Sequence, residues 1–305
     1  MEYTVKHFKV LSCDKTHYLH SVAYIPDGEI KGIFHLVHGM TEYIERYENF
    51  MAAIACRGFI CCGYDNLGHG KTASDSSELG FIAEKNGYEF LVEDVRIFAD
   101  FMKKEFDINN YVLMGHSMGS FIARTASEKY ENDFSKLIIC GTSGPNPLSN
   151  IGIILCHLLV FLKGTRGYSS FLENLVFGSY NKRFSGDTKY EWLSSDKTVI
   201  DKYINDKYCT FRFTISALLD LIRLNAISNK SSWFKNLRND IPILIVSGEE
   251  DPVGNYGKGV NEVYKKLIKC KKSDVSLKLY KNCRHEIHND TCKEQMMQDI
   301  FDFIL

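Results

Sequence analysis

The stretch YVLMGHSMG, residues Tyr111 to Gly119, decides the fold of this chain. It starts with a run of apolar and aromatic residues, as in a strand buried on both faces, and Gly115 and Gly119 then flank Ser117 on either side. Glycine lacks a Cβ, so it permits a sharp turn from strand to helix that leaves a serine hydroxyl exposed. The stretch therefore predicts a strand, a tight turn with Ser117 at its tip, and then a helix.

Apolar runs of strand length recur along the rest of the chain and alternate with amphipathic stretches. The runs span residues 33–37, 59–63, 137–140, 243–246 and 275–280. Residues 91–102 carry apolar side chains at spacings of four and three, which is typical of an amphipathic helix. Residues 3–10 and 17–25 instead alternate polar and apolar positions, as the two strands of a hairpin do. The pattern predicts an α/β fold with a doubly wound, mostly parallel sheet and an antiparallel edge at the amino terminus.

The alternation of strand and helix patterns stops midway along the chain. We predict two parts, a core formed by residues 1–143 and 229–305 and a helical insertion, or cap, at residues 144–228. The most apolar part of the insertion, residues 151–162, is too short to cross a bilayer, which takes about 20 residues. We therefore expect it to form a buried or interfacial helix.

Composition and charge exclude several classes of protein. The 37 basic and 38 acidic residues give a formal net charge of −1, and they form no basic stripe that would suit phosphates, so nucleic acid is not an expected partner. The 10 cysteines follow no repeated spacing, so we expect reduced thiols and neither a disulfide framework nor a structural metal site. Residues 1–6 alternate polar and apolar positions and do not resemble a signal peptide, so a cytoplasmic location is expected.

A serine nucleophile needs a base that accepts its proton, an acid that orients the base, and donors for the oxyanion. The base is expected in the loop that follows the strand at residues 275–280, because such a loop can deliver an imidazole to the sheet edge. His285 is the leading candidate there, and His288 is the reserve.

The orienting acid is expected at the carboxyl end of the strand at residues 243–246. Three carboxylates follow that strand, at Glu249, Glu250 and Asp251. Asp251 is the chosen candidate because the rigid Pro252 comes next and fixes its direction, whereas the two glutamates are expected to be solvated loop charges. The order along the chain is then nucleophile, acid and histidine, which differs from the chymotrypsin and subtilisin orders.

Two backbone amides are expected to stabilise the oxyanion. One belongs to Met118, which follows the nucleophile and lies at the amino terminus of the predicted helix, the favourable end of the helix dipole. The other is expected in the loop after the strand at residues 33–37, where Met40 is the candidate. Both residues would act through their N–H groups, so their side chains matter less.

Five blocks of the sequence resemble those of a known family. They are HGMTE at 38–42, GYDNLGHG at 63–70, GHSMG at 115–119, SGEEDPVG at 247–254 and RHE at 284–286. In this order they resemble the blocks of the monoacylglycerol lipase and lysophospholipase group of serine α/β-hydrolases, over nearly the whole chain. The resemblance implies the α/β-hydrolase fold and a triad of Ser117, Asp251 and His285. It also implies oxyanion amides at Met40 and Met118 and an insertion that caps the active site.

The leading hypothesis is a serine carboxylic-ester hydrolase that acts on single-acyl-chain esters, such as monoacylglycerols, lysophospholipids or shorter esters, through an acyl-enzyme. This chemistry requires no cofactor and no metal ion. The expected partner is a small ester or a lipid, with at most peripheral membrane contact through the cap. The open alternatives are a thioesterase, an acyltransferase or a perhydrolase with the same triad, and a non-catalytic binding protein of the same fold.

Candidate substrate contacts lie in the insertion. Leu155, Leu158 and Leu159 belong to its most apolar stretch, and Phe211 and Ile215 lie on the apolar face of a second predicted helix. Two interpretations are open, since these side chains either line a pocket for an acyl chain or pack the cap onto the core.

Overall fold

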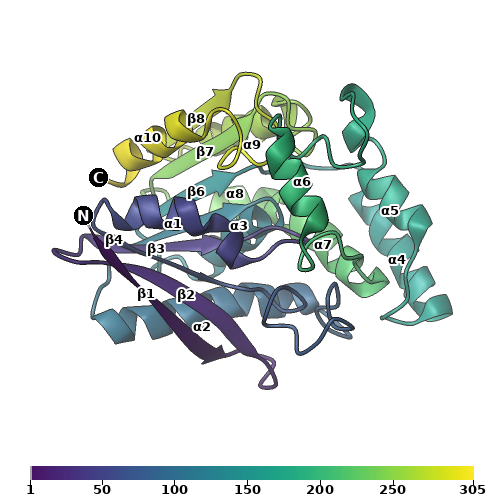
Figure 1. Ribbon diagram of the computed structural model, residues 1–305. Helices are drawn as coiled ribbons and strands as arrows, with labels where there is room; N and C mark the ends of the chain where they lie inside the picture. Colours follow the sequence, from purple (N-terminus) through teal and green to yellow (C-terminus); the bar gives the residue numbers. More distant parts are fainter. Residues whose placement is uncertain (1) are drawn as a thin grey trace.

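A computed structural model describes residues 2–305, and Met1, with which the predicted core begins, lies outside the described residues. The strands span Tyr3–Leu11 (β1), Tyr18–Pro26 (β2), Gly32–Val37 (β3), Phe59–Tyr64 (β4), Tyr111–His116 (β5), Lys136–Cys140 (β6), Ile243–Gly248 (β7) and Val275–Tyr280 (β8). Within the described residues these strands form an 8-stranded sheet in the order β1-β2-β4-β3-β5-β6-β7-β8, with helices on both faces (Figure 1). β2 pairs antiparallel with β1 and with β4, and the other neighbouring strands pair in parallel. The predicted α/β fold with an antiparallel edge is therefore confirmed.

Helices cover both faces of the central strands, which explains why the apolar residues of these strands run consecutively. The helices outside the insertion span Glu48–Ala55 (α1), Gly87–Phe106 (α2), Met118–Lys129 (α3), Ser231–Asn236 (α8), Lys258–Lys269 (α9) and Lys293–Ile304 (α10), with a 3-10 helix at Ile44–Tyr47 (η1). In β5, Leu113 belongs to the cluster formed with α2, α3, α8 and α9. The next residue, Met114, belongs to the cluster formed with α1 and α10 on the opposite face.

The segment between β6 and β7 is helical. Its helices span Ser149–Lys163 (α4), Ser170–Phe177 (α5), Lys197–Asn205 (α6) and Ile215–Ser228 (α7), with a 3-10 helix at Tyr180–Arg183 (η2). Figure 1 shows α4 to α7 grouped beyond one end of the sheet. We keep the division into a core and a cap at residues 144–228 as a proposal.

The apolar stretch at residues 151–162 lies inside α4, as expected. Phe211, in contrast, precedes α7 instead of lying on it, so that part of the helix prediction was wrong. The helix begins at Ile215 because the hydroxyl of Thr214 caps it, accepting the N–H of Ala217 at 3.3 Å. Across residues 2–305, no helix combines the length and the apolar character that crossing a membrane requires.

A single buried cation on α3 holds both ends of the insertion. Where the chain leaves the core, Arg124 donates to Thr142 Oγ1 at 3.3 Å and to Ser143 O at 3.4 Å. Where the chain returns, it donates to Ser228 O and to Asn229 Oδ1, the latter at 3.1 Å. The guanidinium is fully buried, and this burial lowers the pKa of Arg124 to about 9. Both ends of the segment between β6 and β7 are thus bonded to one side chain.

Replacing Arg124 by methionine should lower the free energy of unfolding by about 3 kcal/mol, because several buried oxygen acceptors lose their donor. Urea denaturation followed by circular dichroism measures this loss. Lys129→Met, which removes an exposed cation from the same helix, is the matched control and should change the free energy of unfolding by less than about 0.5 kcal/mol. Equal losses in the two variants would contradict the role given to Arg124.

Candidate active site

The turn at Ser117 has a strained backbone. β5 ends at His116, α3 begins at Met118, and Ser117 between them has φ 55° and ψ −121°. A positive φ is uncommon for a residue that carries a Cβ. The N–H of Ser117 donates to Cys140 O at 3.0 Å, which anchors the turn to the end of β6. The strand, turn and helix therefore follow one another as the sequence pattern predicts.

Two glycines allow α3 to approach the sheet closely. A Cβ on Gly115 would lie 2.1 Å from Gly119 O, and a Cβ on Gly119 would lie 2.1 Å from Val37 O. Both obstacles are backbone atoms, which cannot move aside as a flexible side chain can. Glycine at these two positions is therefore a packing requirement of the turn that presents Ser117.

The proposed acid and base are hydrogen-bonded to each other. His285 Nδ1 lies 2.9 Å from Asp251 Oδ2, and both side chains are buried. The other oxygen of Asp251 accepts the N–H of Val253 at 2.8 Å, so the turn after the acid fixes its direction, as the position of Pro252 suggests. This arrangement leaves Nε2 of His285 available for a proton from another group.

The reserve base, His288, lies elsewhere in the core. Its ring stacks on Tyr47 with centroids 4.3 Å apart and meets the edge of His116 at 4.9 Å. Burial, followed by the charge of His116, lowers the pKa of His288 to about 3. Within residues 2–305 neither ring nitrogen of His288 has a hydrogen-bond partner. His285 lines the same cavity as Ser117 and His288 is not among the described residues that line it, so we keep His285 as the proposed base.

The two proposed oxyanion amides flank the nucleophile. Met118 is the first residue of α3, so no preceding helical carbonyl can accept its N–H. Met40 lies in the loop after β3, and its neighbour Thr41 has φ 54°. Met40, Met118 and Ser117 line the same cavity. Their use as oxyanion donors remains our proposal.

A buried group of charged side chains contacts the loop that carries Met40. Glu42 accepts the N–H of Gly39 at 2.6 Å and the hydroxyl of Tyr47 at 2.9 Å. Arg46 donates to Glu42 at 3.1 Å and, through two nitrogens, to Glu286 at 3.0 and 2.9 Å. One guanidinium thus joins two buried carboxylates from opposite ends of the chain, in the bidentate geometry of strong ion pairs. Sequence analysis assigned no role to these residues.

His116, which precedes Ser117, connects this charged group to the proposed base. Its Nδ1 lies 3.1 Å from Glu42 Oε1, and its Nε2 lies 3.2 Å from the carbonyl oxygen of His285. Burial alone would lower the pKa of His116, but the hydrogen bond to Glu42 and its charge raise it above the usual value of 6.5. Burial alone would raise the pKa of Glu42, but His116 and then Arg46 hold it well below the usual value of 4.5.

The insertion also contacts the loop that carries Met40. The hydroxyl groups of Tyr203, on α6, and Thr41 are hydrogen-bonded at 2.6 Å. Just after α6, Asp206 accepts the hydroxyl of Tyr43 at 2.7 Å. The loop that carries Met40 is therefore bonded both to the insertion and to the buried charges.

Ser117 and His285 line a common cavity between the carboxyl ends of the parallel strands and the insertion. Apolar and aromatic side chains form most of the wall on the insertion side. Among them are Leu148, Phe177, Tyr180, Trp192, Leu221 and Ile222, and Gly152 lines the wall without a side chain. Glu42, Asn146 and Asn225 add polar groups to the wall.

The cavity wall formed by the described residues includes none of the five predicted substrate contacts. Leu155 and Leu159 pack against the core, and Leu158 points outward with 54% of its surface exposed. Phe211 is partly buried against the core, and Ile215 is fully buried in it. The sequence predicted the apolar helix α4 correctly, but it did not predict which residues of that helix line the cavity. Apolar character alone does not determine which face of a helix contacts which neighbour.

Comparisons with known proteins relate the chain to hydrolases. The family model described as serine aminopeptidase, S33, matches residues 28–292. The chain is similar to monoglyceride lipase of Homo sapiens, with 23% identity over 268 residues that cover 87% of this chain and 78% of that protein. It is similar to monoacylglycerol lipase of Mycolicibacterium smegmatis, with 23% identity over 284 residues that cover 92% and 90% of the two chains. Among solved structures, a highly thermostable carboxyl esterase from Bacillus coagulans, in complex with glycerol, superimposes with a TM-score of 0.93 and 30% identity over 99% of each chain.

The pairing of His116 with Glu42 predicts a pH-dependent contribution to stability. A histidine whose pKa is raised in the folded state stabilises the fold fully below its unfolded pKa of about 6.5, and this contribution disappears as pH rises through the folded pKa. His116→Gln should therefore cost more free energy of unfolding at about pH 5.5 than at about pH 9. Chemical denaturation at both pH values measures the difference. His157→Gln, an exposed control, should cost less than about 0.5 kcal/mol at either pH, and an equal cost of His116→Gln at both would contradict the ion pair.

Proposed function

The chain belongs to the serine aminopeptidase S33 family, and from that premise we propose that it hydrolyses single-acyl-chain carboxylic esters through an acyl-enzyme on Ser117. It is a serine hydrolase of the α/β-hydrolase fold. The observation that carries the proposal is the buried Asp251–His285 hydrogen bond of 2.9 Å in a cavity that also exposes Ser117 on its strained turn. This is the arrangement that activates a serine hydroxyl.

The reaction then proceeds in two steps. Nε2 of His285 accepts the proton of the Ser117 hydroxyl while Oγ attacks the ester carbonyl carbon, and Asp251 stabilises the imidazolium. The N–H groups of Met40 and Met118 donate to the tetrahedral oxyanion. The imidazolium returns its proton to the leaving alkoxide, so the alcohol departs and the acyl group stays on Oγ. In the second step His285 deprotonates a water that attacks the acyl-enzyme, which releases the acid and restores the serine.

The cavity supports an acyl chain as the part of the substrate that is recognised. Its wall carries apolar side chains from two helices of the insertion, α5 and α7, and from Leu148, which directly precedes α4. Each methylene transferred from water to such a wall contributes about 0.8 kcal/mol. Several relatives of this length are monoglyceride or monoacylglycerol lipases, which agrees with a lipid monoester as the substrate class. A panel of matched esters and thioesters separates this function from that of a thioesterase.

Covalent labelling tests the proposed nucleophile and base in one experiment. Ser117→Ala and His285→Ala should both lose reaction with a fluorophosphonate probe and lose ester hydrolysis, His285→Ala by at least about a thousandfold in kcat, because only an activated serine reacts. Ser143→Ala removes a second serine from the same cavity and should still be labelled. His288→Phe keeps the ring that stacks on Tyr47 and should also retain labelling.

Labelling of folded Ser117→Ala at the wild-type rate would show that another residue is the nucleophile. Equal losses in His285→Ala and His288→Phe, with both proteins folded, would remove the basis for choosing His285.

The chain-length preference tests the apolar wall. Gly152→Leu should lower kcat/KM for an ester with about eight acyl carbons by at least tenfold and leave acetate esters within about threefold, because a Cβ at this position already comes within 3.3 Å of Ile222 on the facing helix. Leu158→Gln, on the exposed side of the same helix, should leave both esters unchanged. A variant with parallel losses for short and long esters would contradict an acyl pocket next to Gly152.

A further inference from the structure

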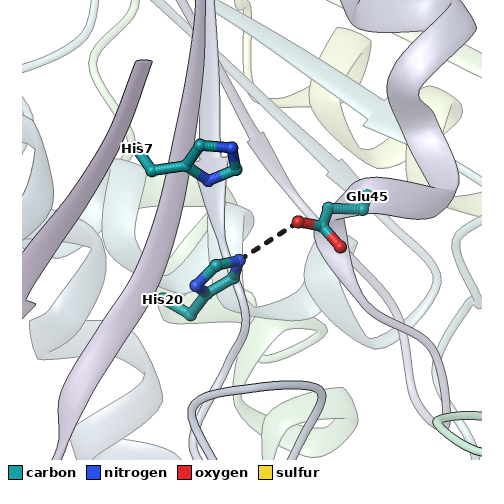
Figure 2. A group of neighbouring side chains, drawn as sticks. All are labelled: His7, His20 and Glu45. Atoms are coloured by element: carbon teal, nitrogen blue, oxygen red, sulfur yellow. Dashed lines mark hydrogen bonds and ion pairs between the residues drawn. The ribbon is translucent and has the colours of Figure 1, made fainter. Parts of the chain in front are cut away.

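A second group of polar side chains lies outside the cavity, where the β1–β2 hairpin meets η1. His7 on β1, His20 on β2 and Glu45 on η1 each offer one ligand atom, and these atoms all lie within 4.8 Å of one another. His20 Nε2 is 3.2 Å from Glu45 Oε1. Figure 2 shows the two imidazole rings and the carboxylate around one common space.

The strand register brings the two histidines together. His7 pairs with Val22 and His20 pairs with Lys9, so the histidines are diagonal neighbours on the same face of the hairpin. Their ring centroids are 5.5 Å apart. His7 lies on the edge strand and is exposed, so its ring can turn without displacing core residues.

The backbone around Glu45 is fixed from both sides. The N–H of Ile44 donates to Asp65 Oδ1 at 2.8 Å, and the side chain of Arg46 is held by Glu286 at 2.9 Å. The carboxylate of Glu45 is therefore presented to the hairpin by a rigid turn, while its own torsions remain free to adjust.

We propose that His7, His20 and Glu45 form a binding site for a divalent transition-metal ion, with Zn²⁺ as the ion that these donors fit best. Two imidazoles and a carboxylate are a common ligand set for zinc, with water at the fourth position. Mg²⁺ and Ca²⁺ are disfavoured because they prefer oxygen ligands. A tetrahedral zinc ion with ligands at about 2.1 Å needs ligand atoms about 3.4 Å apart, so the side chains have to close in by about 1.4 Å at most.

Lys71 is the competitor for this site. Its ammonium lies 2.7 Å from one oxygen of Glu45 and 2.8 Å from the other. The side chain of Lys71 is 41% exposed and flexible, so the ammonium can move into solvent when a metal ion takes its place. Removing this lysine should therefore strengthen metal binding.

Another histidine between carboxylates supplies an internal comparison. His17 Nδ1 faces Asp14 at 2.5 Å, whereas its Nε2 faces Glu78 at 3.2 Å. A single ion cannot use both nitrogens of one ring, so this second group is no chelating site. The expectation of no metal came from the irregular spacing of the cysteines and from the serine chemistry, and it took no account of His7, His20 and Glu45.

Titration of the metal-stripped full-length protein with Zn²⁺, under reducing conditions and against a chromophoric chelator, tests the proposal. Wild type should bind one equivalent saturably and gain in Tm. His7→Ala, His20→Ala and Glu45→Gln should each weaken this binding at least tenfold, because even the loss of an outer-shell partner costs 10–100-fold. Lys71→Met should bind more tightly than wild type. His17→Ala is the matched control and should bind as wild type does.

Wild-type affinity in both His7→Ala and His20→Ala would overturn the proposal, as would a failure of both wild type and Lys71→Met to bind one equivalent. His20→Gln, which keeps the volume and polarity of this half-buried position, replaces His20→Ala if the alanine variant does not fold. Circular dichroism and ester hydrolysis, which uses other residues, report on folding in every variant.

Discussion

The distance of closest approach between α3 and the sheet is the constraint on which the active site depends. Neither Gly115 nor Gly119 has room for a Cβ, because backbone oxygens of α3 and β3 lie about where that atom would be. This close packing accompanies the positive φ of Ser117, which lies between the end of β5 and the start of α3. The positions of the Ser117 hydroxyl and of the Met118 amide thus share one packing contact.

Buried charges connect the other loops that carry proposed site residues. Glu42 bonds the loop that carries Met40 to η1, and Arg46 connects it to Glu286, the residue after the proposed base. His116 joins both through Glu42 and the carbonyl of His285. Such a group is costly to bury, and each member is compensated by the others. The loops that carry Met40, Ser117 and His285 are therefore connected to one another through this buried group.

The sequence was sufficient for features that depend on local pattern. Strands such as β5 are continuous apolar runs because helices cover both faces, and the proposed Ser117, Asp251 and His285 follow β5, β7 and β8. The sequence was insufficient for contacts between segments that lie far apart along the chain. The apolar pattern of α4 does not tell that Leu158 faces solvent, and Arg46 and Glu286 meet from opposite ends of the chain. The signal in the sequence for this ion-pair group was the carboxylate in each of the blocks at 38–42 and 284–286.

The hydrogen bond between Tyr203 and Thr41 has a kinetic consequence. It spans the boundary between the insertion and the loop that carries Met40, so α6 cannot move away from the sheet without breaking this bond or displacing the loop. A movement of α6 would therefore also disturb the loop whose Met40 amide is the proposed oxyanion donor. Conformational steps of this kind limit turnover in many enzymes.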